Sequence, residues 1–208
     1  MTDAAGAVKE MRMDSLGRLV EVIEDPTGKN HSTKYEYEVL DNLTSVKQGT
    51  LADRTFGYTS LSRLDSAYNP ESGSVGYSYD DAGNLISKVD GRAITTCFGS
   101  LVTSVCTASY DGANRALRKA FSDGTPAIDY VYSGERLTNA SGGAASIAYG
   151  YDEVNRVTSR NVAITGGGTS SVGYSYYPAG ISTMTYPSAK VLQYDYEDAG
   201  RTTSAAIG

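Results

Sequence analysis

This chain of 208 residues consists mostly of short runs in which large apolar or aromatic residues alternate with small or polar ones. Turn-forming residues separate the runs. In the run VGYSY, Tyr77 and Tyr79 are separated by one serine, so both rings point to one face of an extended strand. Asp80 and Gly83 follow, and then a second run, NLISKV. Aspartate starts a tight turn by accepting hydrogen bonds from the next backbone amides, and glycine ends it with a positive φ. The pattern predicts a β-hairpin over residues 75–89.

The same pattern recurs along the whole chain. Its second aromatic position is occupied by Met13, Tyr37, Tyr58, Tyr79, Tyr110, Tyr132, Tyr151, Tyr176 and Tyr196, which are spaced by about 23 residues on average. Its first aromatic position is occupied by Tyr35, Tyr77, Tyr130, Tyr149, Tyr174 and Tyr194. Self-similarity at such a period is typical of repeat architectures, in which each unit is one small supersecondary element. We therefore predict an all-β fold of tandem antiparallel β-hairpins.

The turn inside each hairpin has its own signature. An acidic residue follows the second tyrosine at Asp80, Asp111 and Asp152. The turn glycines are Gly17, Gly83 and Gly200, and asparagine stands at or beside this position at Asn42, Asn114 and Asn155. Asparagine is the residue that best replaces glycine in a left-handed conformation. The clusters DPTGKN, NPESG and SDGTP lie between hairpins and predict connecting turns rather than linkers.

Two copies depart from this signature. The copy at residues 130–139 has a shortened turn. In the copy at residues 174–183, we align Tyr177 with the turn aspartate and Ile181 with the arginine that follows the turn glycine elsewhere. We expect both copies to be hairpins with altered turns.

A long gap between two copies contains an insertion, which we place at residues 93–109. The inserted segment contains Cys97 and Cys106. In an oxidising compartment these cysteines could form a disulfide across a hairpin, and two free buried thiols are the alternative.

The pattern continues to both ends of the chain. Residues 2–13 have the sequence of a turn and a second strand without a first strand, and residues 194–208 stop after a second strand. We therefore expect a single array of about nine units over residues 1–208, truncated at both ends, with exposed strand edges.

Composition narrows the possible functions. The net charge of −6 argues against nucleic-acid binding, which needs a basic surface. No apolar run is long enough to span a bilayer, and the first residues lack the features of a signal peptide. His31 is the one histidine, and with two cysteines it cannot complete a four-ligand zinc site. We expect no catalytic, cofactor-binding or metal-binding residues and no membrane insertion.

Each set of repeated residues, the tyrosines and the turn acids, has two possible roles. The tyrosines could stack on glycans, or they could form cross-strand ladders that hold the sheet together. The turn acids Asp14, Glu38, Asp80, Asp111, Asp152 and Glu197 could hold calcium, or each could satisfy the amides of its own turn. We favour the structural reading for both sets, because every unit carries them.

Several segments resemble the Rhs/YD-repeat family, whose loose consensus is Y-x-Y-D-x-x-G-R-L. They are YSYDDAGNLISKVDGR at 77–92, YGYDEVNRVTSRN at 149–161, YEYEVLDNLTSVKQG at 35–49 and MDSLGRLVEVIEDPTGK at 13–29. The resemblance covers nearly the whole chain and is strongest at residues 11–92 and 147–204. The repetition of the motif makes the resemblance more specific than any single copy.

The resemblance implies that the hairpins lie side by side and form a spiralling, curved sheet. This chain would then be a fragment of the repeat region of a longer protein. In complete members, such as bacterial Rhs toxins, toxin-complex C components and teneurins, that sheet closes into a hollow shell. In the bacterial members the shell encloses a toxic C-terminal domain. The implied function is a non-enzymatic shell module of a larger, secreted or surface-delivered bacterial protein. Its partners would then be the remainder of that protein and its toxin cargo.

Two alternatives to the shell role remain. The sheet could be a cell-surface adhesion module that binds glycan or protein. Its exposed strand edges could also pair with further copies of the chain and form a fibre. Sizing in solution and glycan binding would discriminate these alternatives. A hydrolase is disfavoured, because a triad would have to use His31 in a loop-like stretch.

Overall fold

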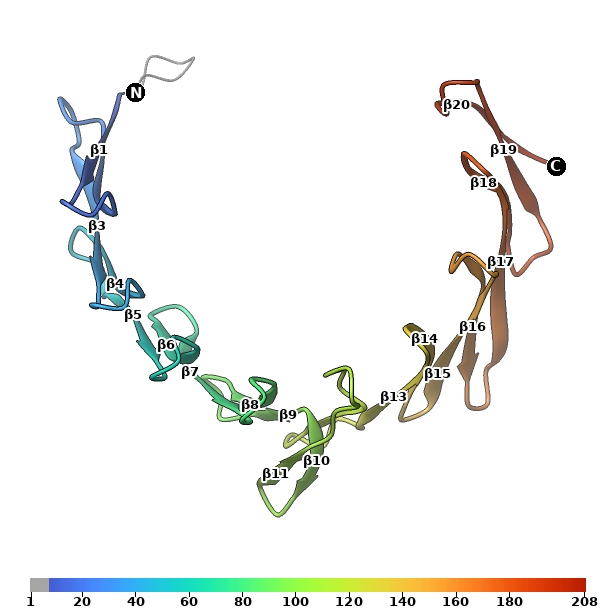
Figure 1. Cartoon of the computed structure of the whole chain (residues 1–208), viewed down its shortest axis with the longest axis horizontal. Coiled ribbons are helices and arrows are strands. Elements are labelled where there is room, and N and C mark those ends of the chain that lie inside the picture. The colour runs from blue at the N-terminus through green and yellow to red at the C-terminus, as the bar shows by residue number, and fades with distance from the viewer. Residues whose placement is uncertain (1–7) are drawn as a thin grey trace. The chain divides into compact units, whose positions relative to one another are not determined.

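The computed structural model describes residues 8–208, which contain 20 β-strands and no helix (Figure 1). The prediction of an all-β fold built from tandem antiparallel hairpins is confirmed. The turn predicted at the start of the 2–13 segment lies outside the described residues. The strand predicted there is β1 (Lys9–Met13), but it is the first strand of a hairpin rather than a second strand, because it pairs with Leu19–Glu24 across the turn at Asp14. The chain divides after Cys97 into two compact units, which are described separately.

The first unit is a nine-stranded antiparallel meander, in which each strand pairs with the next one along the chain. After β1, its strands are β2 (Leu19–Glu24), β3 (His31–Tyr37), β4 (Leu43–Gln48), β5 (Arg54–Tyr58), β6 (Leu64–Asn69), β7 (Gly73–Tyr79), β8 (Leu85–Val89) and β9 (Thr95–Cys97). Figure 1 shows them succeeding one another in chain order, from blue to green.

The second unit begins with a separate hairpin, β10 (Gly99–Val102) and β11 (Val105–Ala108). A second antiparallel meander follows. Its strands are β12 (Arg118–Phe121), β13 (Ile128–Ser133), β14 (Arg136–Gly142), β15 (Ala145–Tyr151), β16 (Val157–Ile164), β17 (Gly168–Tyr177), β18 (Gly180–Thr185), β19 (Val191–Tyr196) and β20 (Thr202–Ile207). The predicted insertion at residues 93–109 contains β9 and the β10–β11 hairpin. The single array over residues 1–208 stays a prediction.

The strand register gives the sheet of each unit two different faces. On one face, which we call the tyrosine face, most second tyrosines lie opposite aliphatic residues, as in Tyr79 opposite Leu85, whereas Tyr196 lies opposite Thr202. On the other, the small-residue face, serine and glycine predominate, as in Ser78 opposite Ser87. This alternation follows from the two-residue period of a strand.

A β-bulge shifts the register just before the second tyrosine of each regular hairpin. In the β7–β8 hairpin, Ser78 pairs with Ser87 but Tyr79 pairs with Leu85, so Ile86 is the extra residue. Since the bulge lies in the return strand, the tyrosine strand keeps its alternation and both of its rings stay on the tyrosine face. A bulge of this kind bends the strand and increases its twist.

The sheet is a single layer with very few fully buried side chains. Among the described residues, the buried apolar side chains are Ile23, Ala67, Cys97 and Ala120. The tyrosines of the repeat are half-buried. Stability therefore depends on backbone ladders and on the contacts of the tyrosine face rather than on a thick aliphatic core.

The turn glycine position has a left-handed backbone in every regular hairpin. Gly83 has a φ of 89°, and its amide donates to the carbonyl of Asp80 at 3.0 Å. Asn114 and Asn155 occupy the same position with φ values of 58° and 69°. In the β3–β4 turn this position belongs to Asp41, with a φ of 69°, and Asn42 lies beside it.

Replacing Gly83 with valine should lower the free energy of unfolding by more than about 1 kcal/mol, because a β-branched residue at positive φ is strained. Gly83→Asn should cost less, since asparagine tolerates this conformation. Urea denaturation measures both values. Equal stability of the valine variant and the native chain would contradict the turn assignment.

Candidate functional site

The second tyrosines connect consecutive hairpins by hydrogen bonds. The Tyr79 hydroxyl donates to the carbonyl of Leu64, the first residue of the preceding return strand, at 2.7 Å. Tyr151 makes the equivalent bond to Leu137 at 2.7 Å. The same bond joins Tyr37 to Leu19, Tyr176 to Val157 and Tyr196 to Ile181. Each ring therefore belongs to one hairpin and is anchored on its neighbour.

An arginine from the preceding hairpin covers most of these rings. Arg156 follows the left-handed turn residue of its own hairpin, and its guanidinium carbon lies 4.5 Å from the centroid of the Tyr176 ring. The same pairing joins Arg18 to Tyr37, Arg63 to Tyr79, Arg115 to Tyr132 and Arg136 to Tyr151, at 5.0, 4.9, 4.2 and 5.6 Å. A cation held over an aromatic face in this way is attracted by the ring quadrupole.

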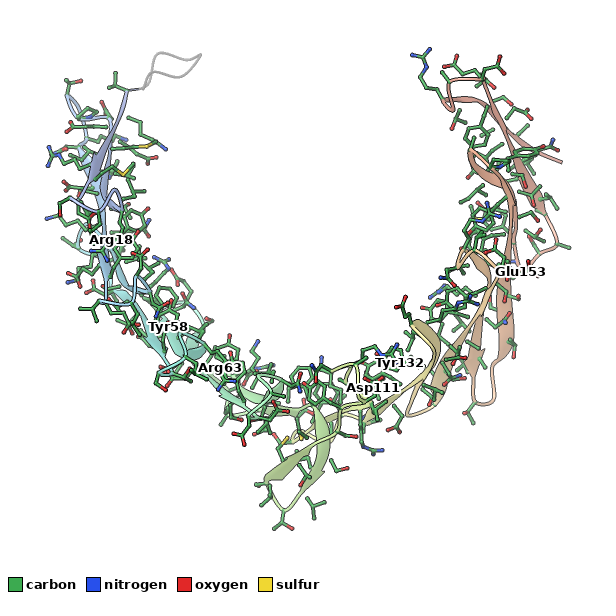
Figure 2. All side chains as sticks on the ribbon, viewed as in Figure 1. Arg18, Tyr58, Arg63, Asp111, Tyr132 and Glu153 are labelled. Carbon is green, nitrogen blue, oxygen red and sulfur yellow. The ribbon has the colours of Figure 1, made fainter. Side chains whose placement is uncertain are left out.

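The guanidinium also binds both turns between which it lies. Arg156 Nε donates to Asp152 Oδ2 of its own turn at 2.7 Å, and Nη1 donates to the Tyr177 carbonyl of the next turn at 3.3 Å. Arg18 makes the same two contacts with Asp14 Oδ2 and the Glu38 carbonyl. We call this set of contacts the clasp. Arg18, Arg63, Asp111 and Tyr132, which belong to three different clasps, are labelled in Figure 2.

The turn carboxylates hold their own turns closed with their second oxygen. Asp14 Oδ1 accepts from the amides of Leu16 and Arg18, each at 2.9 Å. The hydrogen bond from the Arg18 amide is the main cause of a lowered pKa at Asp14, and bonds from the Arg18 side chain and the Leu16 amide add to it. Both oxygens are thus engaged in the clasp. Within residues 8–208, no group of three or more histidine, cysteine, aspartate or glutamate side chains is placed to hold a metal ion.

Lowering the pH should loosen the turns, because the turn carboxylates have lowered pKa values. These groups are Asp14, Asp80, Asp111 and Asp152, and in each the main cause is hydrogen bonding to the charged form from the residue four positions further on, which is Asn84 for Asp80 and arginine for the other three. A carboxylate whose pKa is lowered by folding stabilises the fold above its unfolded pKa, near 3.9, and loses that contribution as the pH falls through the folded value. The melting temperature should therefore fall steeply below about pH 4.

The structure places the first tyrosines differently from the predicted aromatic ladder. Tyr77 lies opposite Lys88 and Tyr149 opposite Arg160. Tyr35, Tyr130, Tyr174 and Tyr194 lie opposite Val46, Ala140, Met184 and Ala205. Within the described residues, the ring pair that packs directly is Tyr177 with Tyr196. The repeated tyrosines thus pack on aliphatic side chains and arginines rather than on one another.

The remaining predicted residues lie as follows. Tyr110 forms an isolated bridge with Ala116, and burial raises the pKa of Tyr58. Gly200 has a φ of 79°. Cys97 and Cys106 are both disulfide-bonded in the structure.

The alignment of Ile181 with arginine is wrong. Ile181 pairs with Tyr176, and its carbonyl accepts from Tyr196, as Leu64 does for Tyr79. It therefore occupies the leucine position, and the arginine position is missing from this shorter turn.

Sequence reasoning missed the arginines of the clasp. Their signal was present, because Arg18, Arg63, Arg115, Arg136 and Arg156 each follow the turn just before the return strand. Their contacts could not be read from the pattern, since each partner ring is 15 to 20 residues further along the chain.

The clasp of Arg63 lacks its carboxylate. Thr59 stands where the other turns carry an acid, and its hydroxyl accepts from the amides of Leu61 and Arg63 at 3.3 and 3.2 Å. Arg63 still covers Tyr79 and donates from Nη1 to the Asp80 carbonyl. Its Nε is buried and has no hydrogen-bond partner.

Among known proteins, similarity to this chain is found in solved structures and not in family profiles or curated sequences. No known family profile matches the chain, and no curated protein matches it. A chain in the crystal structure of TcdB2-TccC3-Cdc42 superposes with a TM-score of 0.73 at 11% identity, covering 94% of this chain and 11% of that chain. This similarity shows the fold alone, and the present chain spans about a tenth of the length of that one.

A second structure is more distant. It is that of the Photorhabdus luminescens Tc holotoxin pore with the mutation TccC3-D651A. Its TM-score is 0.40 at 13% identity, covering 99% of this chain and 15% of that chain, and it supports no argument. Among residues 8–208, no helix has the length and apolar character needed to cross a membrane.

Proposed function

We propose that the chain is a non-enzymatic wall segment of an Rhs/YD-repeat shell, which encloses or displays a C-terminal toxin domain in a larger secreted or surface-delivered bacterial protein. The observation that supports this proposal is the fold similarity over 94% of the chain to a much longer chain in the TcdB2-TccC3-Cdc42 structure. The YD-repeat resemblance of the sequence supports the same role.

The clasps are contacts that would stabilise a wall segment of a shell. A single-layer sheet has little buried apolar area, so neighbouring hairpins need another means of staying in register. The clasp provides one at successive junctions, with a ring, a cation and a carbonyl contributed by adjacent hairpins. We expect such a strip to form a continuous, hydrogen-bonded barrier between a cargo and solvent. Its partners would be the remainder of the parent protein and that cargo.

Limited proteolysis of the complete gene product tests this function. A domain encoded after the repeats should resist protease in the native protein. It should become sensitive when several clasps are broken, for example in a combined Arg18→Ala, Arg115→Ala and Arg156→Ala variant. Equal cleavage of that domain in both proteins, or a reading frame without such a domain, would contradict the shell role.

A further inference from the structure

At the junction between the β17–β18 and β19–β20 hairpins, the turn that would supply the arginine is shortened. Across its turn, Tyr176 pairs with Ile181, whereas Tyr79 pairs with Leu85 across a turn that is one residue longer. The missing residue is the one that is arginine at Arg18, Arg63, Arg115 and Arg156 and asparagine at Asn42 and Asn84. Within the described residues, cations lie over the second tyrosines Tyr37, Tyr79, Tyr132, Tyr151 and Tyr176, and none lies over Tyr58 or Tyr196.

A second aromatic ring stands beside Tyr196 instead. The Tyr177 ring lies edge-on to it, with centroids 6.5 Å apart and planes at 84°. Tyr177 occupies the position of the turn aspartate and is 45% exposed. Gly180 packs closely on Tyr196, because a Cβ on Gly180 would lie 2.7 Å from the phenol oxygen. Two residues of the shortened turn, Tyr177 and Gly180, thus contact the Tyr196 ring.

A surface pocket of about 420 Å³ opens at this place. Besides the two tyrosines, its lining contains the acidic residues Asp195, Glu197 and Asp198. The Asp195 carboxylate accepts from the Ser204 hydroxyl on the small-residue face, so Glu197 and Asp198 are the acids that can supply charge to the pocket. The cation of this region, Arg201, is paired with Glu197, and its side chain is 81% exposed. The pocket therefore combines aromatic surface with a net negative charge.

The backbone acceptor of a regular clasp is also present. Glu197 follows Tyr196 as Asp80 follows Tyr79. The Asp80 carbonyl accepts from the Gly83 amide and also from Arg63 Nη1, so a carbonyl at this position can serve the turn and a guanidinium together. The Glu197 carbonyl accepts from the Gly200 amide in the same way.

We propose that this pocket binds a cationic side chain from another protein, in the first place the guanidinium of an arginine in an exposed basic segment. The guanidinium would contact the Tyr177 and Tyr196 rings, donate to the Glu197 carbonyl and pair with the carboxylates, as the chain's own arginines do at the regular junctions. Cation–π attraction and charge pairing favour arginine over a neutral side chain of the same shape. This inference does not depend on the shell function.

An NMR titration tests the site with the peptide acetyl-Gly-Arg-Gly-amide and its citrulline counterpart. We expect saturable shifts of the Tyr177 and Tyr196 signals, with a dissociation constant in roughly the millimolar range. The uncharged citrulline peptide should bind about fivefold more weakly or not at all. Equal affinity for the two peptides, or shifts located elsewhere, would overturn the proposal.

Two variants supply matched controls. Insertion of one arginine after Gly180 restores the regular turn length and should abolish peptide binding, because the chain's own guanidinium then covers Tyr196. Conversely, Arg156→Ala uncovers Tyr176 beside Asp152 and should create a second site for the arginine peptide. Unchanged binding by the insertion variant, with its β-sheet circular dichroism intact, contradicts the proposal. If the insertion variant does not fold, Tyr177→Ala decides the matter: it should weaken binding, and unchanged affinity would refute the site.

Discussion

Replacing Tyr79 with alanine should lower the free energy of unfolding by about 3 kcal/mol, as expected for truncation of a large aromatic side chain. The variant loses the ring that packs opposite Leu85, the hydroxyl bond to the Leu64 carbonyl and the surface under Arg63. One contact within the β7–β8 hairpin and two contacts with the preceding hairpin thus disappear together. Urea denaturation followed by circular dichroism measures the change.

Two further variants separate the contributions at Tyr79. Tyr79→Phe keeps the ring under Arg63 and removes only the hydroxyl bond, so it should cost about 1 kcal/mol. Tyr68, which lies outside the repeat positions and is 41% exposed, provides the matched control. Tyr68→Ala should cost about 1 kcal/mol or less. If Tyr79→Ala cost no more than Tyr68→Ala, the clasp would not be a stabilising element.

Replacing Thr59 with aspartate should stabilise the first unit by about 1–2 kcal/mol, because it supplies the missing partner of a buried donor. Arg63 Nε is buried without a hydrogen-bond partner, whereas Arg115 Nε donates to Asp111 Oδ2 at 2.7 Å in a complete clasp. The aspartate would also keep the turn bonds that the Thr59 hydroxyl now accepts. A rise in the midpoint of urea denaturation measures the gain.

The charge of the new side chain is the decisive feature of this test. Thr59→Asn retains an acceptor for the turn amides but brings no negative charge, so it should give a smaller gain. The benefit of Thr59→Asp should also vanish at low pH, as the carboxylate protonates. The reciprocal change, Asp152→Thr, should destabilise the second unit by removing the acceptor of Arg156 Nε. A Thr59→Asp variant no more stable than Thr59→Asn would show that the buried Nε is satisfied by water.

Several features of the fold could be predicted from local patterns. The alternation around Ser78 determines which side chains share a face, and the acid-to-glycine spacing in residues 80–83 determines a turn that ends at positive φ. Both depend on residues within one turn or two strand positions of each other. Their recurrence predicted the order of the hairpins, which the strand pairing of each unit confirms.

The candidate site depended on contacts that no local pattern defines. The partner of Arg156 is the ring of Tyr176, and the bulge before that tyrosine sets the strand register beside it. The misplaced Ile181 shows the same limit, since one missing residue in a turn changes which side chain occupies a position while leaving the Y-x-Y pattern intact. Thus the sequence by itself determined the hairpins, their turns and their repetition, because these follow from neighbouring residues. Only the tertiary structure decided which arginine covers which ring and which rings are left uncovered, because those contacts depend on the register between hairpins.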